Sequence, residues 1–200
     1  MPKALIIDNH TKHLEQLRSL IPFESVVLNW NNINDTDVTA YSIVILSGGS
    51  DMPPVAEYPE KYIEERALIR SSSVPIIGIC LGCELIAYEF GAHLKNLGKK
   101  RQGFVQVSFN PSFQSSFKQK EVIAYEAHSR IIENLPETFS VIAISEHGPE
   151  IIHHRERPLW GIQFHPEHLT ERTLGDEIFL TILNESLSLD PNANLPLQNL

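Results

Sequence analysis

Cysteine, basic residues and long apolar runs are all scarce in this 200-residue chain. Cys80 and Cys83, three positions apart, make a poor disulfide framework for a domain of this size, so we expect a reducing, cytoplasmic setting. Sixteen basic residues against 25 acidic ones give a formal charge of −9, which argues against nucleic acid or an anionic membrane as the main partner. Because no apolar run reaches the roughly 18 residues of a membrane span and the first residues lack a signal-peptide core, we expect neither a span nor a secretory signal.

Hydrophobic residues make up 42% of the chain, enough for the core of one domain, which we expect over residues 1–188. Residues 189–200 are rich in proline and asparagine, so we expect a loose tail there. Apolar strand-like runs alternate with helical patterns in the first half, and we expect strands at 3–8, 25–28, 41–46 and 74–79 and helices at 11–20, 59–70 and from 81 onward. The 59–70 helix should turn Glu60, Glu64 and Glu65 outward.

The second half of the chain carries strand-like runs without long helices between them. These runs are 104–109, 121–127, 139–145, 150–154 and 159–164, and an amphipathic helix is expected at 170–187. The two halves together predict an α/β fold: a doubly wound, mostly parallel central sheet with helices on both faces and additional antiparallel strands. In such sheets ligands bind at the carboxyl ends of the strands.

The segment at 76–90 joins a buried strand to a helix through the pattern Gly78-x-Cys80-x-Gly82. This is the cysteine form of a nucleophile elbow, a sharp turn that exposes its central side chain. Glycines two positions to either side remove side chains that would clash in that turn. The thiol also stands at a helix N-terminus, where partial positive charge favours the thiolate. The pattern therefore predicts that Cys80 is a nucleophile.

A second strand-like run ends in His165, followed by Glu167. A cysteine nucleophile needs a base that takes and returns a proton, and a carboxylate two residues beyond a histidine can hold its tautomer. The third element is the loop Ser47-Gly48-Gly49, after the strand at 41–46, where backbone N–H groups could form an oxyanion hole. We therefore expect a triad of Cys80, His165 and Glu167 beside a glycine loop.

These segments, together with Ile6-Ile7-Asp8-Asn9 and Ala127-His128-Ser129, resemble the class I (triad) glutamine amidotransferases, over roughly residues 3–187. The likeness is greatest to the amidotransferase domains of GMP synthetase and anthranilate synthase. The resemblance implies a flavodoxin-like amidotransferase fold and hydrolysis of the glutamine side-chain amide through a thioester on Cys80, without a cofactor. It also implies a separate synthetase subunit that accepts the ammonia.

The resemblance further assigns site residues one by one. Backbone N–H groups of Gly49 and Leu81 would form the oxyanion hole. Substrate contacts would come from Gly48, Glu84, His128 and Ser129. One position departs from the family pattern, because Glu84 stands where the family usually has glutamine. A carboxylate donates no hydrogen bond unless it is protonated, so the substrate is either glutamine or another γ-glutamyl compound.

Alternative readings of the same residues remain. Cys80-x-x-Cys83 could be a redox pair, but that would leave the glycines and His165 without a role, and Cys83 fits a helix residue without chemistry. A metal site built on His153-His154 is disfavoured because adjacent strand residues point to opposite faces, so we expect no metal. Two other functions stay open: a stand-alone γ-glutamyl hydrolase, favoured by Glu84, and a catalytically silent binding module, disfavoured by the complete triad.

Overall fold

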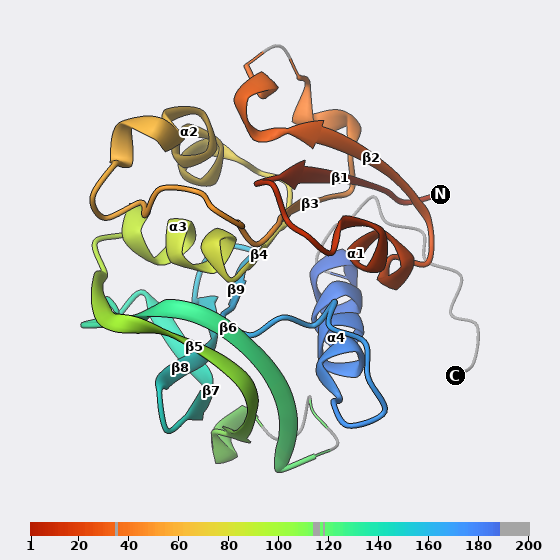
Figure 1. Cartoon of the computed structure of the whole chain (residues 1–200). Coiled ribbons are helices and arrows are strands. Elements are labelled where there is room, and N and C mark those ends of the chain that lie inside the picture. The colour runs from red at the N-terminus through yellow and green to blue at the C-terminus, as the bar shows by residue number, and fades with distance from the viewer. Residues whose placement is uncertain (35, 114–116, 118, 189–200) are drawn as a thin grey trace.

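A computed structural model describes residues 1–34, 36–113, 117 and 119–188. Its nine strands form one continuous sheet in the order β2-β1-β3-β4-β9-β8-β7-β5-β6 (Figure 1). Its helix and strand bounds give an α/β fold, and the doubly wound core with antiparallel additions is confirmed. The tail predicted at 189–200 lies outside the described residues.

The first five strands in that order form the parallel half of the sheet. They are β2 (Glu24–Asn29), β1 (Lys3–Asp8), β3 (Ile43–Leu46), β4 (Ile76–Ile79) and β9 (Leu159–Ile162). The order matches the flavodoxin-like pattern, with β9 in the place of the fifth strand. Strands β3, β4 and β9 are buried on both faces, which explains why they read as continuous apolar runs.

Helices cover both faces of this parallel half (Figure 1). One core cluster joins the sheet to α1 (Leu14–Leu20) and α4 (Gly175–Ser188), and the other joins it to α2 (Ile63–Ser71) and α3 (Leu81–Glu89). Short 3₁₀ turns occupy Trp30–Asn32, Val38–Ala40, Pro59–Tyr62 and Pro111–Phe113.

The expectation that Glu65 faces outward is wrong. Glu60 is exposed and Glu64 is half-buried, but only 1% of Glu65 is exposed, and its carboxylate accepts a hydrogen bond from the side chain of Asn9 at 3.0 Å. The first turn of the predicted helix is a 3₁₀ turn, which changes the rotation of the residues that follow it. A charge pattern alone does not show this change.

Two helices begin later than predicted because side chains compete for the backbone at their starts. The Asp8 carboxylate accepts the N–H of Thr11 at 3.0 Å, which forms a turn before α1. Before α4, the Thr173 hydroxyl donates to the carbonyls of His168 and Thr170. No helix among the described residues is long and apolar enough to cross a membrane.

The remaining strands form an antiparallel extension: β8 (Gly148–His154), β7 (Phe139–Ser145), β5 (His93–Phe109) and β6 (Glu121–Glu133). Strands β5 and β6 are longer than the predicted segments at 104–109 and 121–127. Strands β5 and β6 curl in front of β7 and β8 (Figure 1), and the N–H of His165 donates to the Tyr125 carbonyl of β6 at 2.8 Å. Strand β6 therefore reaches the edge of the sheet where β9 ends.

Candidate active site

Cys80 lies on the turn between β4 and α3, and its backbone is in an unusual conformation, with φ 49° and ψ −101°. A Cβ atom on Gly78 would lie 2.3 Å from the Gly82 carbonyl oxygen, and one on Gly82 would lie 2.5 Å from the Leu46 carbonyl oxygen. Both glycines are therefore required by close backbone contacts, as the sequence pattern predicted. A non-glycine residue at this φ is strained, and such strain concentrates at functional sites.

The imidazole of His165 lies between Cys80 and Glu167. Its Nδ1 contacts Glu167 Oε1 at 2.8 Å, and the carboxyl group of Glu167 is fully buried. This contact leaves Nε2 available to Cys80, which lies close enough for its charge to act on the imidazole but makes no hydrogen bond with it in this structure. Burial lowers the pKa of His165, but the charges of Cys80 and Glu167 outweigh burial and hold that pKa well above its ordinary value. The raised pKa means that His165 can carry the proton that a general acid gives to a leaving group.

The glycine loop after β3 packs directly against these groups. A Cβ on Gly48 would lie 3.0 Å from His165 Cε1 and 3.6 Å from Cys80 Cβ, and one on Gly49 would lie 2.4 Å from Leu81 Cδ2. The absence of side chains at these two positions lets the backbone approach the His165 imidazole and the Leu81 side chain this closely.

The support of this loop is a buried hydrogen-bonded set that the sequence did not reveal. The N–H of Asn9 donates to the Ser47 hydroxyl at 2.8 Å, and the Asn9 amide donates to the Ser47 carbonyl at 3.2 Å and to Glu65. Burial raises the pKa of Glu65 to about 7, against the opposing hydrogen bond from Asn9. The neighbouring Asp8 shapes the turn before α1, whereas Asn9 holds the glycine loop.

Two adjoining pockets of about 240 Å³ each meet at the triad. Cys80, Leu81 and Glu84 line one pocket, and His165 and Gly48 line the other. The residues shared by both are Lys12, Gly49, Ser50, Lys100 and Ala127. A substrate in the first pocket would reach the thiol, and the second pocket would give access to the imidazole.

Glu84, the departure from the family pattern, lies on the wall of the first pocket and is 6% exposed. Its Oε1 accepts a hydrogen bond from the Gln163 amide at 3.4 Å. Burial raises the pKa of Glu84 to about 7, against the opposing effects of Arg130, Gln163 and His165. Near neutral pH the group is thus divided between a charged acceptor and a neutral acid that can donate a hydrogen bond.

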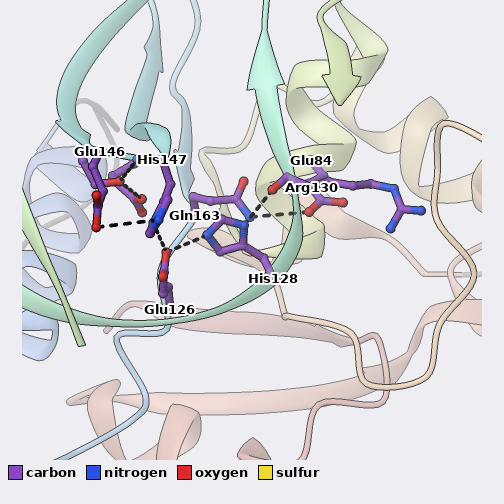
Figure 2. Close-up of polar contacts among 9 residues, drawn as sticks. Glu84, Glu126, His128, Arg130, Glu146, His147 and Gln163 are labelled. Atoms are coloured by element: carbon purple, nitrogen blue, oxygen red, sulfur yellow. Dashed lines mark hydrogen bonds and ion pairs between the residues drawn. The ribbon is translucent and has the colours of Figure 1, made fainter. Parts of the chain in front are cut away.

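His128 and Ser129, the two predicted substrate contacts that follow Ala127 on β6, differ in how their side chains face the pocket. Ser129 lines the first pocket and accepts a hydrogen bond from Arg130 at 3.3 Å. His128 contributes to the pocket wall, but its imidazole is turned inward toward Glu126 (Figure 2) and is 1% exposed. Arg130, which the sequence did not single out, brings a cation to this pocket and pairs with Glu57 at 2.7 Å.

Cys83 and the histidine pair, for which other chemistry was considered, are packed against neighbouring side chains. Cys80 and Cys83 are free thiols, and complete burial raises the pKa of Cys83 well above its ordinary value. His153 stacks on Trp160, whereas His154 packs among aromatic rings. The two imidazoles do not converge with His165.

A family model described as "Glutamine amidotransferase class-I" matches residues 5–183. The GMP synthase [glutamine-hydrolyzing] of Chlamydia caviae is 33% identical over 189 residues, covering 89% of this chain and 36% of the relative. The glutamine-hydrolyzing GMP synthase subunit of Pyrococcus abyssi is 32% identical over 170 residues, covering 82% and 88% of the two chains. This chain thus spans about a third of the longer relative, but most of the archaeal subunit.

A solved structure agrees with these matches. A protein from Thermoplasma acidophilum, described as a subunit of GMP synthase, superposes with a TM-score of 0.79 and 29% identity. The superposition covers 94% of this chain and 95% of that chain.

Proposed function

The chain belongs to the class I glutamine amidotransferase family, and we propose that it hydrolyses the side-chain amide of glutamine and passes the ammonia to a synthetase subunit. One observation carries the proposal: the thiol of Cys80 stands on a strained turn at a pocket and is paired with His165, which Glu167 orients. A silent binding module would need none of this geometry.

The first half-reaction forms a thioester. The Cys80 thiolate attacks the carboxamide carbon, and the negative charge moves to the carbonyl oxygen. Backbone N–H groups of Gly49 and Leu81 stabilise that oxygen, a role supported by the contact between these two residues beside Cys80. The C–N bond then breaks as His165 gives its proton to the departing nitrogen, which leaves ammonia and a γ-glutamyl thioester.

The second half-reaction releases glutamate. Water enters from the side of the second pocket, which His165 lines, and the neutral imidazole takes a proton from the water as it attacks the thioester. The C–S bond breaks, glutamate leaves, and the thiolate and imidazolium are restored. Glu167 stays ionised throughout and holds the imidazole through Nδ1.

The amino-acid end of the substrate requires a cationic and an anionic partner. Arg130 supplies the cation for the substrate carboxylate, and Ser129 and Glu84 lie on the same pocket wall. The relatives are named GMP synthases, and the archaeal one is a subunit, so the first ammonia acceptor to test is the nucleotide-amidating subunit of a GMP synthase.

One observation favours a second candidate function. Glu84 stands where the family usually has glutamine, whose amide donates hydrogen bonds at any pH. A carboxyl group donates only when it is protonated, so another γ-glutamyl compound could be the better substrate. In that case the chain would act alone as a γ-glutamyl hydrolase.

The deciding experiment measures ammonia or amine release by the purified chain from glutamine and from a set of γ-glutamyl amides, with and without the synthetase subunit. We expect glutamine to be hydrolysed slowly by the chain alone and faster with the subunit, and we expect no turnover by Cys80→Ser. Turnover of γ-glutamyl amides but not of glutamine, unaffected by the subunit, would support the second candidate and overturn the first.

A further inference from the structure

Behind the pocket wall, three buried ligand groups converge on one point. Glu126 and His128 come from β6 and Glu150 comes from β8, and one potential ligand atom from each lies within 4.8 Å of the other two. Strands β6 and β8 are not neighbours in the sheet order, so the cluster joins two parts of the curled extension that the ladder of hydrogen bonds does not join. All three side chains are buried.

The cluster has three acceptor atoms facing one another. His128 Nδ1 lies 2.6 Å from the Arg130 carbonyl oxygen, which can only accept, so Nδ1 carries a proton and, in the neutral ring, Nε2 carries a lone pair. That Nε2 lies 3.2 Å from Glu126 Oε2 without hydrogen-bond geometry. Glu150 Oε2 has no hydrogen-bond partner among the described residues, although its residue is 1% exposed. Buried acceptors arranged in this way need a metal ion or a proton between them.

We propose that Glu126, His128 and Glu150 bind a divalent transition-metal ion, with Zn²⁺ as the natural probe. One imidazole nitrogen and two carboxylate oxygens form a donor set that suits such ions, and their two negative charges match the charge of the ion. This site does not include His153 or His154, the histidines for which a metal site was considered from the sequence and disfavoured.

The surroundings resemble the supporting shell of a metal site (Figure 2). The Arg130 carbonyl fixes the tautomer of His128, His147 Nδ1 contacts Glu126 Oε2 at 2.9 Å, and the Ser145 hydroxyl donates to Glu150 Oε1 at 2.7 Å. His147 is 13% exposed, so the turn between β7 and β8 offers the ion a way in.

The ion would brace the wall of the active site. Glu126 lies next to Tyr125, whose carbonyl holds the N–H of His165, and Ala127, between Glu126 and His128, lines both pockets. Tying β6 to β8 therefore fixes the segment that positions His165 from the side opposite Glu167. The ion itself touches neither Cys80 nor the substrate in this proposal.

Protons are the alternative occupant. Burial, together with the nearby charge of Glu126, raises the pKa of Glu150 to about 8, against the hydrogen bond from Ser145. Without a metal ion, Glu150 would hold a proton at neutral pH, and its replacement by glutamine would cost little. A bound metal ion and a bound proton therefore lead to opposite predictions for the effect of Glu150→Gln.

The test uses the full chain without a histidine tag. Zinc content after dialysis and zinc affinity by calorimetry are measured for wild type, Glu150→Gln, Glu126→Gln and Cys80→Ser, and each melting temperature is recorded with zinc and with a chelator. We expect one zinc per wild-type and Cys80→Ser chain, a melting temperature that the chelator lowers, and affinity lost by at least about tenfold in both glutamine variants.

Two results would overturn the proposal. The first is zinc binding that disappears in Cys80→Ser and persists in Glu150→Gln, since that would place the ion on the catalytic thiol. The second is no zinc binding by wild type, with Glu150→Gln as stable as wild type or more so, since that would show a shared proton. Glu65→Gln serves as the control, because Glu65 is an equally buried carboxyl group outside the cluster.

Discussion

Glu84 and Arg130 place one charge of each sign on the same pocket wall, and the protonation of Glu84 changes within the working pH range. Below about pH 7 the neutral acid can donate a hydrogen bond to the substrate as an amide would. Above it, in the proposed binding mode, the carboxylate would repel the developing oxyanion and the substrate carboxylate. The pH therefore decides whether Glu84 on this pocket wall can donate a hydrogen bond or only accept one.

We expect kcat/KM for glutamine to fall in wild type as the pH rises through about 7, and Glu84→Gln to remove that fall. A hydrogen bond to a charged group is worth roughly 1.5–3 kcal/mol, so the variant should gain about ten- to a hundredfold at alkaline pH. The measurement is a pH profile of kcat/KM for both proteins.

Glu60→Gln is the control for this profile, because it removes the same charge from an exposed position outside the pocket. A Glu84→Gln profile that matches wild type on every γ-glutamyl substrate tested would show that Glu84 does not contact the substrate. A larger loss of activity on another γ-glutamyl compound than on glutamine would identify Glu84 as a specificity residue for that compound.

His165 and Glu167 should differ in the size of their effects. His165 moves protons in both half-reactions, so we expect His165→Ala to lower kcat by about 10⁴-fold or more. Glu167 orients and polarises the imidazole through Nδ1, and we expect Glu167→Gln to lower kcat by about 10²-fold. Steady-state kinetics measure both. Equal losses in the two variants would require a direct chemical role for Glu167.

At the scale of the element, the elbow depends on the backbone packing of β3, β4 and α3. Gly78 and Gly82 lie so close to neighbouring carbonyl groups that an added Cβ cannot be accommodated without moving the main chain. The same turn sets the direction of the Cys80 side chain. Stability and activity should therefore be lost together when either glycine is replaced.

We expect Gly78→Ala to lower the free energy of unfolding by about 1–3 kcal/mol, as overpacking does, and to abolish turnover. Urea unfolding and ammonia release measure the two effects. Gly91→Ala is the matched control: Gly91 has φ 91° with open space around it, so alanine should cost about 1–2 kcal/mol through φ while turnover persists. An active Gly78→Ala protein would contradict the elbow account.

The same element scale shows what sequence patterns can foresee. Apolar runs predicted each strand of the parallel half. They are continuous in β3, β4 and β9, because strands buried on both faces consist of hydrophobic residues throughout. The glycine spacing predicted the elbow, because the turn forces that spacing. The inward orientation of Glu65 was not foreseeable, because it follows from a 3₁₀ turn and from a tertiary hydrogen bond to Asn9. Strand β6 was predicted too short, because its second half pairs with a distant segment of β5.

At the scale of the whole molecule, the chain keeps carboxyl groups in its interior. Burial raises the pKa values of Glu65 and Glu84 to about 7 each. Between the ordinary pKa of a glutamate and pH 7, the folded protein therefore holds protons that the unfolded chain has released. These two groups therefore make the free energy of unfolding fall as the pH rises through this window, because at these positions the unfolded state binds fewer protons.

We expect Glu65 and Glu84 each to lower the free energy of unfolding by on the order of 1 kcal/mol or more between about pH 5 and 7, whereas histidines with a pKa lowered by burial, such as His153, act in the opposite direction. Glu65→Gln should remove its share, because the amide stays neutral and its oxygen still accepts from Asn9. Urea unfolding of wild type and the variant at both pH values gives the difference directly. A larger pH dependence in Glu65→Gln than in wild type would contradict the assignment.

The whole account depends on Cys80 being the nucleophile, and covalent labelling tests that most directly. The purified chain is treated with a glutamine-analogue electrophile, and the modified residue is identified by mass spectrometry while the remaining glutaminase activity is followed. Cys80 at the pocket should be labelled in step with the loss of activity, and Cys83, fully buried with a raised pKa, should stay unmodified. Equal labelling of both thiols, or loss of activity without modification of Cys80, would contradict the account.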